Sequence, residues 1–398
     1  MEGRGLIKLT ESEPQDAGMD RDQIALIRER LPQWMDGTQE RGGVFLAARK
    51  GRIVLHEAIG PQTDKVDSPP MTTDSVFQVS SISKPITAIG IMLLVEDGLL
   101  GLNRPIKEYF PEICGENTDD VEVQHLLTHT GGFREQTVWT HYFKHLSKRE
   151  SKPAANVHPY TSEYLEVTRD VQSDFPPGSM MEYCSHNYAL LAALIGRVSG
   201  QPLLSFFKER IFDPLGMEGA CYARDPSNIA HHVIRGENVP AGSMPGDKIL
   251  GVEGTEREQF PYGYMGVNAR ALDLAILGQT MLNKGTYGDF RLLSPASVHE
   301  MTRDQLPGIP SAINGMQSAE ASWGLGWAIQ GNKRWPGFSS TLVPKGSFWH
   351  TGNGGSQLWV DPVNEIVGVY LSVTLILDDS AIHWHGDMFQ NMVTAAAV

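Results

Sequence analysis

Segments with strand character lie near both ends of this 398-residue chain, and a long, mostly helical stretch separates them. Two β-rich runs within 42–60 surround Lys50-Gly51, the pattern of a hairpin with a turn glycine. Three more β-rich runs occupy 346–373, separated by glycine-rich and Asp-Pro turns. This order predicts an α+β fold with one mostly antiparallel sheet built from both ends and a helical domain inserted between them.

Helices are expected to flank that sheet. Apolar residues recur at helical spacing in 19–37, with Asp20 as the N-cap and Gly37 as the stop: Ile24, Ile27, Leu31 and Trp34. Residues 272–285 and 378–398 are predicted to form two further helices. The predicted domains are a sheet domain formed by 16–80 and 255–398 and a mostly helical domain formed by 81–254.

Composition limits the classes of function. The chain is 41% apolar and 20% charged, which is typical of a globular protein with one or two domains. Its net charge of −14 disfavours nucleic acid and anionic bilayers as partners. The N-terminus lacks an apolar signal region, and no run approaches the roughly 18 residues of a membrane span. We therefore expect a soluble cytoplasmic protein; the alternative is a secreted protein whose signal segment is missing from this sequence.

Ser81 and Lys84 stand just ahead of an apolar run that is predicted to be a helix starting near Ser81. Side chains three residues apart share a helix face, so the two would be neighbours. A serine hydroxyl needs a base to act as a nucleophile, and a lysine whose pKa is lowered by desolvation can serve. The unpaired N–H of Ser81 at the helix start would point to where an oxyanion develops. The alternative is an ordinary solvated helix end.

Ser-x-x-Lys is a weak pattern by itself, because the chain contains a second copy at Ser205 and Lys208. That copy lies in an amphipathic helix where Lys208 falls on the solvated face, so we interpret it as structural. Two further residues sit where catalytic groups are plausible. Tyr183 lies between a Pro-Gly loop and an apolar helix, and His350 ends a β-rich run beside glycines. Each also has a plain interpretation as a packing or surface residue.

Together these segments resemble the serine β-lactamase superfamily, in the branch of class C β-lactamases, D-aminopeptidases, DD-peptidases and family VIII carboxylesterases. Eight segments fall in family order, among them "VFQVSSISKPITA", "EVQHLLTHTGGF", "FPPGSMMEYCSHNYALL", "WGLGWAI" and "HTGNGGS". The resemblance implies a β-lactamase/DD-peptidase-like fold in which a helix-flanked antiparallel sheet packs against a mostly helical domain. The active site is expected at their junction.

The resemblance also implies the roles of individual residues. Ser81 would be the acylated nucleophile, Lys84 its base, and Tyr183 a proton relay or a second base. His350 would stand where many relatives have the lysine of Lys-Thr-Gly. The backbone N–H groups of Ser81 and Asn353 would form the oxyanion hole, and the expected substrate-binding residues are Ser185, Asn187, Thr351 and Gly352.

Two departures from the family pattern bear on the substrate. The family usually has Tyr-x-Asn, whereas this chain has Tyr183-Cys184-Ser185, and serine reaches less far toward a substrate amide; Asn187 is a candidate to compensate. Imidazole at His350 is largely neutral at neutral pH and can donate a hydrogen bond, whereas a lysine would attract a carboxylate. The first departure favours an ester or another small-molecule acyl substrate. The second argues against an efficient β-lactamase, although D-aminopeptidases of this branch also have His-x-Gly. The loop 138–167 is a candidate source of acyl-pocket aromatics.

The sequence therefore predicts a cofactor-free serine hydrolase that forms an acyl-enzyme and prefers esters, with transesterification as the same chemistry on another acceptor. The alternatives are an amide hydrolase of the D-aminopeptidase, DD-peptidase or β-lactamase type, and a non-catalytic binding or scaffold protein. The pairs His125/His129 and His141/His145 have zinc-ligand spacing but lack an HExxH glutamate, so we expect no metal. Three residues are interpreted as thiols that are buried or incidental: Cys114, Cys184 and Cys221.

Overall fold

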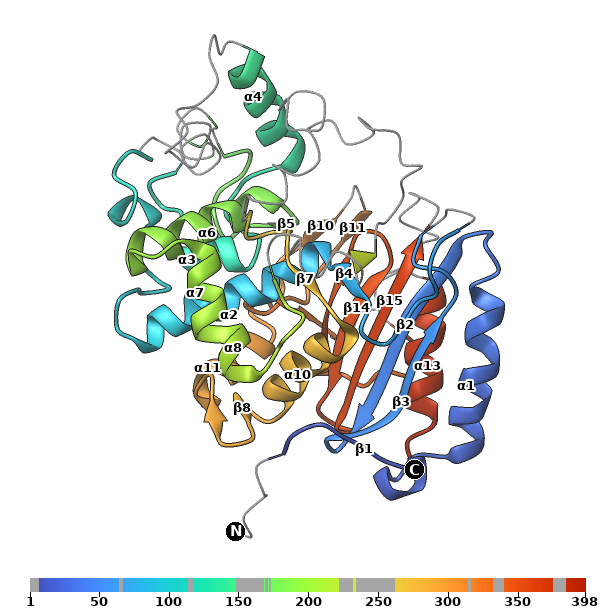
Figure 1. Ribbon diagram of the computed structural model, residues 1–398. Helices are drawn as coiled ribbons and strands as arrows, with labels where there is room; N and C mark the ends of the chain where they lie inside the picture. Colours follow the sequence, from blue (N-terminus) through green and yellow to red (C-terminus); the bar gives the residue numbers. More distant parts are fainter. Residues whose placement is uncertain are drawn as a thin grey trace.

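Strands from the two ends of the chain form one seven-stranded sheet in the computed structural model (Figure 1). The strand order is β1-β3-β2-β15-β14-β13-β12, and every neighbouring pair is antiparallel except β1 with β3. The predicted α+β fold with an antiparallel sheet is confirmed. The strands are β1 (Thr10–Glu11), β2 (Glu40–Arg49), β3 (Arg52–Ile59), β12 (Ala328–Ile329), β13 (Phe348–Gly352), β14 (Ser356–Asp361) and β15 (Ile366–Thr374).

The structure describes most of the chain. The described residues are 7–63, 67–113, 118–147, 168, 171, 173–221, 232–233, 262–313, 316–331, 340–374 and 384–398. Cys114, residues 148–167 of the predicted loop 138–167, and the predicted domain boundary at 254/255 lie outside them. The boundaries of the two predicted domains therefore remain a prediction.

The hairpin predicted around Lys50-Gly51 joins β2 to β3. Arg49 pairs with Arg52, and the two turn residues have positive φ angles of 53° and 78°. Positive φ at both central residues is what a tight two-residue hairpin turn requires, and glycine adopts it without steric cost. The hairpin prediction is confirmed.

Helices cover both faces of the sheet (Figure 1). On one face α1 (Arg21–Trp34) and α13 (Trp384–Ala395) pack together over Phe45, Trp359 and Tyr370. On the other face α10 (Ala271–Leu282) covers a second apolar cluster that includes Leu46 and Leu358. Neighbouring residues of a strand point to opposite faces, which is why Phe45 and Leu46 enter different clusters.

The first predicted helix begins as expected but ends early. Asp20 is its N-cap and accepts a hydrogen bond from the Gln23 N–H at 2.9 Å. The helix ends at Trp34, three residues before the predicted stop at Gly37. The closing helix is described from Trp384 onward, and the start predicted at 378 lies outside the described residues.

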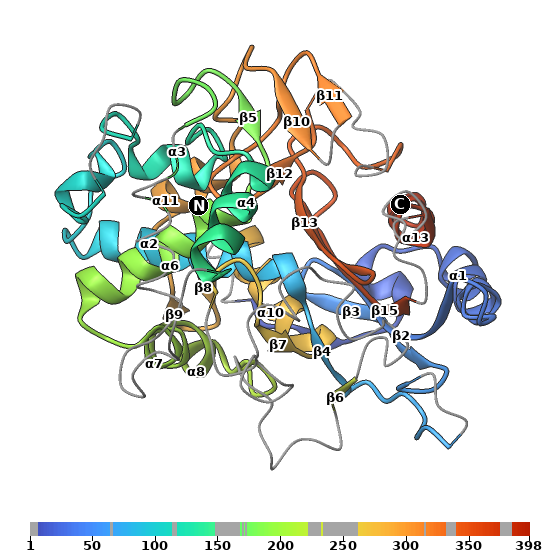
Figure 2. The ribbon, with the colours of Figure 1, turned by 90° about the horizontal axis from the view of Figure 1, so that it is seen from above.

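A helical layer lies beside the sheet (Figures 1 and 2). Its central contact is between α2 (Ser83–Glu96) and α6 (Ser185–Ser199), both mostly buried. The described residues also form α3 (Val123–Leu127), α4 (Glu135–Ser147), α7 (Leu203–Phe207), α8 (Asp213–Leu215), α11 (Pro295–Thr302), the π-helix Lys208–Phe212, and the 3₁₀ turns Pro14–Ala17, Ser80–Ile82 and Ile106–Glu108. Within the described residues no single helix is long and apolar enough to cross a membrane; α6 and the segment Leu203–Leu215 pass that test only as a pair bent by 84°.

Short strand pairs tie the helical layer to the segments that carry the site. In one sheet β4 (Val76–Gln78), which leads into Ser81, lies between β6 (His232–Val233) and β7 (Asn268–Ala269). In another, β5 (Met181–Glu182), which leads into Tyr183, pairs with β10 (Ser311–Ile313), and β10 pairs with β11 (Met316–Ser318). A last pair joins β8 (Thr286–Tyr287) to β9 (Phe290–Arg291).

Candidate active site

Ser81 and Lys84 are in direct contact. Ser81 lies in the 3₁₀ turn Ser80–Ile82, which leads directly into α2 at Ser83, close to the predicted helix start. Ser80 has a φ of 48°, which lies outside the right-handed helical region. The Nζ atom of Lys84 lies 2.8 Å from Oγ of Ser81 and 3.3 Å from the carbonyl oxygen of Tyr264. The predicted nucleophile–base pair is therefore within hydrogen-bond distance.

Burial makes Lys84 a feasible base. Its side chain is fully buried, and this desolvation lowers its pKa from 10.5 to about 7. The negative charge of Glu135 acts in the opposite direction. Three aromatic rings surround the amine, with centroids 4.6 Å (Tyr183), 5.7 Å (Tyr264) and 6.0 Å (Tyr188) from Nζ. A substantial fraction of Lys84 is thus uncharged at neutral pH and can accept the proton of Ser81.

Tyr183 follows β5 and faces the same pair. Burial raises the pKa of its phenol above the usual value, while a hydrogen bond with the Ser81 side chain lowers it by a smaller amount. The phenol therefore keeps its proton at neutral pH. Of the two roles predicted for Tyr183, this favours a proton relay over the base, and it leaves the base role to Lys84.

His350 is buried on β13, and its ring centroid lies 6.2 Å from that of Tyr183. Burial, with a smaller effect of the Lys84 charge, lowers the pKa of His350 to about 3, so the imidazole is neutral. Its Nδ1 atom lies 2.7 Å from the carbonyl oxygen of Thr351, which assigns the N–H to Nδ1. The imidazole is neutral, as expected. Its one N–H, on Nδ1, donates to the carbonyl oxygen of Thr351, so Nε2 can only accept a hydrogen bond from a substrate.

The turn after β13 packs directly on the Ser81 turn. The Ser80 hydroxyl donates to the carbonyl oxygen of Asn353 at 3.1 Å. A Cβ added to Gly352 would lie 2.2 Å from the carbonyl oxygen of Val79, so only glycine allows this approach. The two backbone amides predicted to form an oxyanion hole, those of Ser81 and Asn353, therefore come from adjacent turns. Their role remains a prediction.

The residues predicted to bind substrate occupy different places. Thr351 and Gly352 end β13 beside the Ser81 turn. Ser185 is the first residue of α6, and its N–H donates to Oε2 of Glu135 at 2.5 Å. Asn187 is buried within α6 against Gly131, and neither atom of its amide has a hydrogen-bond partner among the described residues. Its proposed compensation for the missing asparagine stays a prediction without support from these contacts.

Two residues next to the site were missed by sequence reasoning as site residues. His129 has a φ of 59°, and its Nδ1 accepts from the N–H of Cys184 at 3.2 Å. Its ring packs against that of Tyr183, with the centroids 4.5 Å apart. Glu135 accepts from Trp139 Nε1 at 2.9 Å besides Ser185. Both residues belong to the segment "HTGGFRE" (129–135), which begins with His129 and ends with Glu135. Most of this segment lies in a stretch that resembles the family, and that is the signal that could have indicated them.

The alternative sites have ordinary structural explanations. Lys208 of the second Ser-x-x-Lys copy is exposed and pairs with Asp213 at 2.6 Å. Cys184 is a buried free thiol and Cys221 a partly buried one. No group of three potential metal ligands occurs in the part of the chain that the structure describes.

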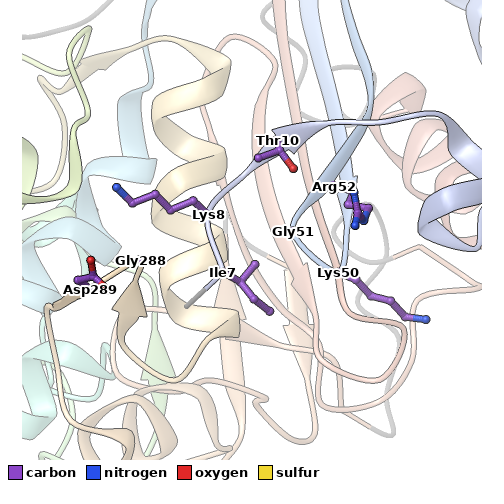
Figure 3. Close-up of a pocket in the computed structure, with 8 residues that line it drawn as sticks. All are labelled: Ile7, Lys8, Thr10, Lys50, Gly51, Arg52, Gly288 and Asp289. Carbon is purple, nitrogen blue, oxygen red and sulfur yellow. The ribbon is translucent and has the colours of Figure 1, made fainter. Parts of the chain in front are cut away.

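A groove of about 500 Å³ lies far from these residues (Figure 3). It is lined by Ile7, Lys8, Thr10, Lys50, Gly51, Arg52, Gly288 and Asp289. Lys50 is at the end of the sheet where Arg49 pairs with Ile366, whereas Gly352 pairs with Ser356 at the other end. Lys8 and Lys50 extend in different directions in Figure 3, so their charges do not converge on one ligand.

Comparison with known proteins agrees with this geometry. The family model described as "Beta-lactamase" matches residues 27–386. A putative D-alanyl-D-alanine carboxypeptidase of Escherichia coli K12 is 25% identical over 391 residues, which cover 92% of this chain and 85% of the relative. The chain belongs to the β-lactamase family and is a serine hydrolase of the serine β-lactamase superfamily.

Solved structures show the same fold. EstCE1, described as a hydrolase with promiscuous acyltransferase activity, superposes with a TM-score of 0.71 at 19% identity, covering 94% of this chain and 98% of that one. A family VIII carboxylesterase superposes with a TM-score of 0.70 at 19% identity, covering 96% and 98%. At this level of identity the likeness concerns the fold alone.

Proposed function

We propose that this protein is a carboxylesterase that acts through an acyl-enzyme on Ser81 and prefers small, uncharged acyl esters. The observation that carries the proposal is the contact of 2.8 Å between Ser81 and a buried Lys84 whose pKa is about 7. An amine with a pKa near the working pH is partly neutral, so it can accept a proton, and it is still basic enough to hold that proton.

The proposed reaction conserves protons within three side chains. Lys84 takes the proton of Ser81 as Oγ attacks the ester carbonyl, and the N–H groups of Ser81 and Asn353 stabilise the oxyanion. Tyr183 donates its proton to the leaving alcohol and is reprotonated by Lys84, whose amine lies 4.6 Å from the phenol ring centroid. Water then attacks the acyl-enzyme by the same steps in reverse order. An alcohol in place of water gives acyl transfer.

The charges around the site support an ester over an amide substrate that carries a carboxylate. His350 is neutral, and Glu135 adds a negative charge next to Ser185. Arg134 lies nearby in sequence, but it is half-exposed and pairs with Glu182 at 3.4 Å. Apart from Lys84, which is partly protonated near pH 7, the contacts described above offer a substrate carboxylate no unpaired cation. A neutral ester does not need one.

An amide hydrolase is the second candidate, because the carboxypeptidase relative noted above is 25% identical over most of this chain. The two functions are separated by comparing kcat/KM for p-nitrophenyl esters of graded acyl length with that for D-alanine p-nitroanilide and nitrocefin. We expect the short esters to be turned over fastest. Faster turnover of the anilide or of nitrocefin would reject the ester preference.

The nucleophile is tested by fluorophosphonate labelling followed by peptide mass spectrometry. We expect the label on Ser81 and its loss in Ser81→Ala. The matched control is Ser205→Ala, which alters the serine of the second Ser-x-x-Lys copy and should leave labelling unchanged. An unlabelled wild-type protein would support the non-catalytic alternative instead.

A further inference from the structure

A buried carboxylate that takes no part in the proposed chemistry lies behind the turn 353–355. Glu40, the first residue of β2, is 2% exposed. Its Oε2 accepts from the Tyr370 hydroxyl at 2.7 Å and lies 2.6 Å from Nδ1 of His385. Its Oε1 accepts from the Ser372 hydroxyl at 2.5 Å. Three side chains from β15 and α13 thus contact the two oxygens of one buried carboxyl group.

This cluster touches the turn through Ser372. The Ser372 N–H donates to the carbonyl oxygen of Gly355 at 3.1 Å, and the Ser372 Oγ lies 3.3 Å from the same oxygen. The Ser372 hydroxyl has one proton, and its shorter bond is to Glu40. The backbone N–H of Ser372 therefore fixes the turn through Gly355, and Glu40 fixes the side chain of Ser372. Gly355 has a φ of 83°, and a Cβ on it would lie 2.2 Å from Ser372 Oγ. The turn therefore rests directly on the cluster.

The strand that carries Ser372 is irregular at this point. The pairing of β15 with β2 shifts register between Ser372 and Thr374, and Thr374 pairs with Glu40. A bulge interrupts the regular ladder and leaves fewer backbone hydrogen bonds to fix the local conformation. Side-chain bonds to Glu40 supply that constraint instead.

The turn is also fixed at its other end, where Asn353 accepts from the Ser80 hydroxyl at 3.1 Å. We propose that Glu40 and Ser372 are positioning residues that fix the direction of the Asn353 N–H by holding the turn from behind. The proposal rests on the function proposed above, in which this N–H stabilises the oxyanion. An oxyanion-hole donor acts on the transition state and not on the bound ester, so its misalignment should lower kcat and leave KM nearly unchanged.

The test compares two buried serine-to-alanine changes. Ser372→Ala removes the bond to Glu40. The control Ser340→Ala removes bonds to Gln390 at 2.7 Å and to the carbonyl oxygen of Asp387 at 3.1 Å, two residues of α13 that lie outside the turn 353–355. We expect Ser372→Ala to lower kcat for a p-nitrophenyl ester by roughly tenfold or more at constant KM. The inhibition constant of a boronic acid, whose oxygen occupies the oxyanion position, should rise in parallel. Ser340→Ala should change neither value by more than about twofold.

Several outcomes separate this proposal from the proposed function. If wild type is labelled by fluorophosphonate at Ser81 but Ser372→Ala behaves like Ser340→Ala, the positioning role is rejected alone. If wild type is not labelled, both proposals are rejected. Circular dichroism checks folding, and Glu40→Gln takes the place of Ser372→Ala if that variant does not fold. A loss of thermal stability with unchanged kcat in both variants would also reject the role, since it would show support of the core only.

Discussion

The amine of Lys84 lies 2.8 Å from the Ser81 hydroxyl and 4.6 Å from the centre of the Tyr183 ring, so one buried nitrogen contacts both side chains. In the proposed reaction the protonation state of that nitrogen decides whether attack can begin. Lys84, Tyr183, His350 and the neighbouring Glu135 therefore give separate, testable predictions.

The pH profile should report the Lys84 amine. The amine must be neutral to act as a base, and burial lowers its pKa to about 7. We expect kcat/KM for a neutral ester to rise with pH through a pKa near 7 and to level off above it. Stopped-flow rates between pH 5 and 9 check this. A rise centred near pH 10 would show that the amine is not desolvated in the working enzyme.

Lys84→Met should remove activity and stabilise the fold. The pKa of Lys84 is lowered on folding, so the unfolded chain binds more protons between about pH 7 and 10.5 and the stability of wild type rises with pH over that range. The penalty for burying the amine is thus largest below pH 7. We expect Lys84→Met to raise Tm by roughly 3 °C or more at pH 6, with a smaller gain at pH 9. An equal gain at both pH values would contradict this interpretation.

Glu135→Gln should shift the pH profile to lower pH. The carboxylate opposes the lowering of the Lys84 pKa, so its removal should lower that pKa further. At pH 6 we expect kcat/KM relative to the plateau to increase by roughly twofold or more. Glu108→Gln, which changes an exposed glutamate paired with Arg104, is the control and should leave the profile in place. A shift to higher pH in Glu135→Gln would reject the assignment.

Tyr183→Phe tests the proton relay. The phenol stays protonated at neutral pH because burial raises its pKa, and the variant keeps the ring that packs on His129 at 4.5 Å. We expect kcat to fall by about 10²-fold to 10⁴-fold. The loss should be smaller for p-nitrophenyl esters than for alkyl esters, because p-nitrophenolate leaves without a proton. Equal losses for both leaving groups would argue for a role in activating Ser81 instead.

His350→Lys should change substrate preference. Lysine would restore the family's Lys-Thr-Gly pattern and place a cation beside Tyr183, where a carboxylate-bearing substrate can pair with it. We expect faster labelling of Ser81 by a fluorescent penicillin and a lower Tm, because His350 is buried. His350→Gln, which adds no charge, serves as the control. Unchanged labelling in the lysine variant would show that charge at this position does not limit carboxylate binding.

The sequence predicted those features of the fold and the site that depend on residues close together in the chain. The hairpin at Lys50-Gly51, the N-cap Asp20 and the spacing of Ser81 and Lys84 depend on neighbours a few residues away, and the structure has all three. The sequence predicts a helix start near Ser81, and the structure has a 3₁₀ turn at Ser80–Ile82 followed by α2 from Ser83. The positive φ of Ser80 and the hydrogen bond from its hydroxyl to the carbonyl oxygen of Asn353, about 270 residues later, were not predictable. No local pattern contains that information.

The same limit applies to the surroundings of the site. Glu135 reaches Ser185, and Glu40 reaches Ser372, across separations of 50 and 332 residues. The residues next to Glu40 and Glu135 in the sequence do not indicate these hydrogen-bond partners. The burial that lowers the pKa of Lys84 likewise depends on Tyr183 and Tyr264, which belong to distant segments.

The pairing of β2 with β15 has a consequence for synthesis on the ribosome. Residues 40–49 leave the ribosome more than 300 residues before 366–374, the strand with which they pair throughout their length. Until then β2 has an unpaired edge on the side that β15 later occupies. Contacts this distant in sequence form slowly, whereas α2 and α6 can pack much earlier. A nascent chain thus contains Ser81 and Lys84 long before β15 is available to complete the sheet.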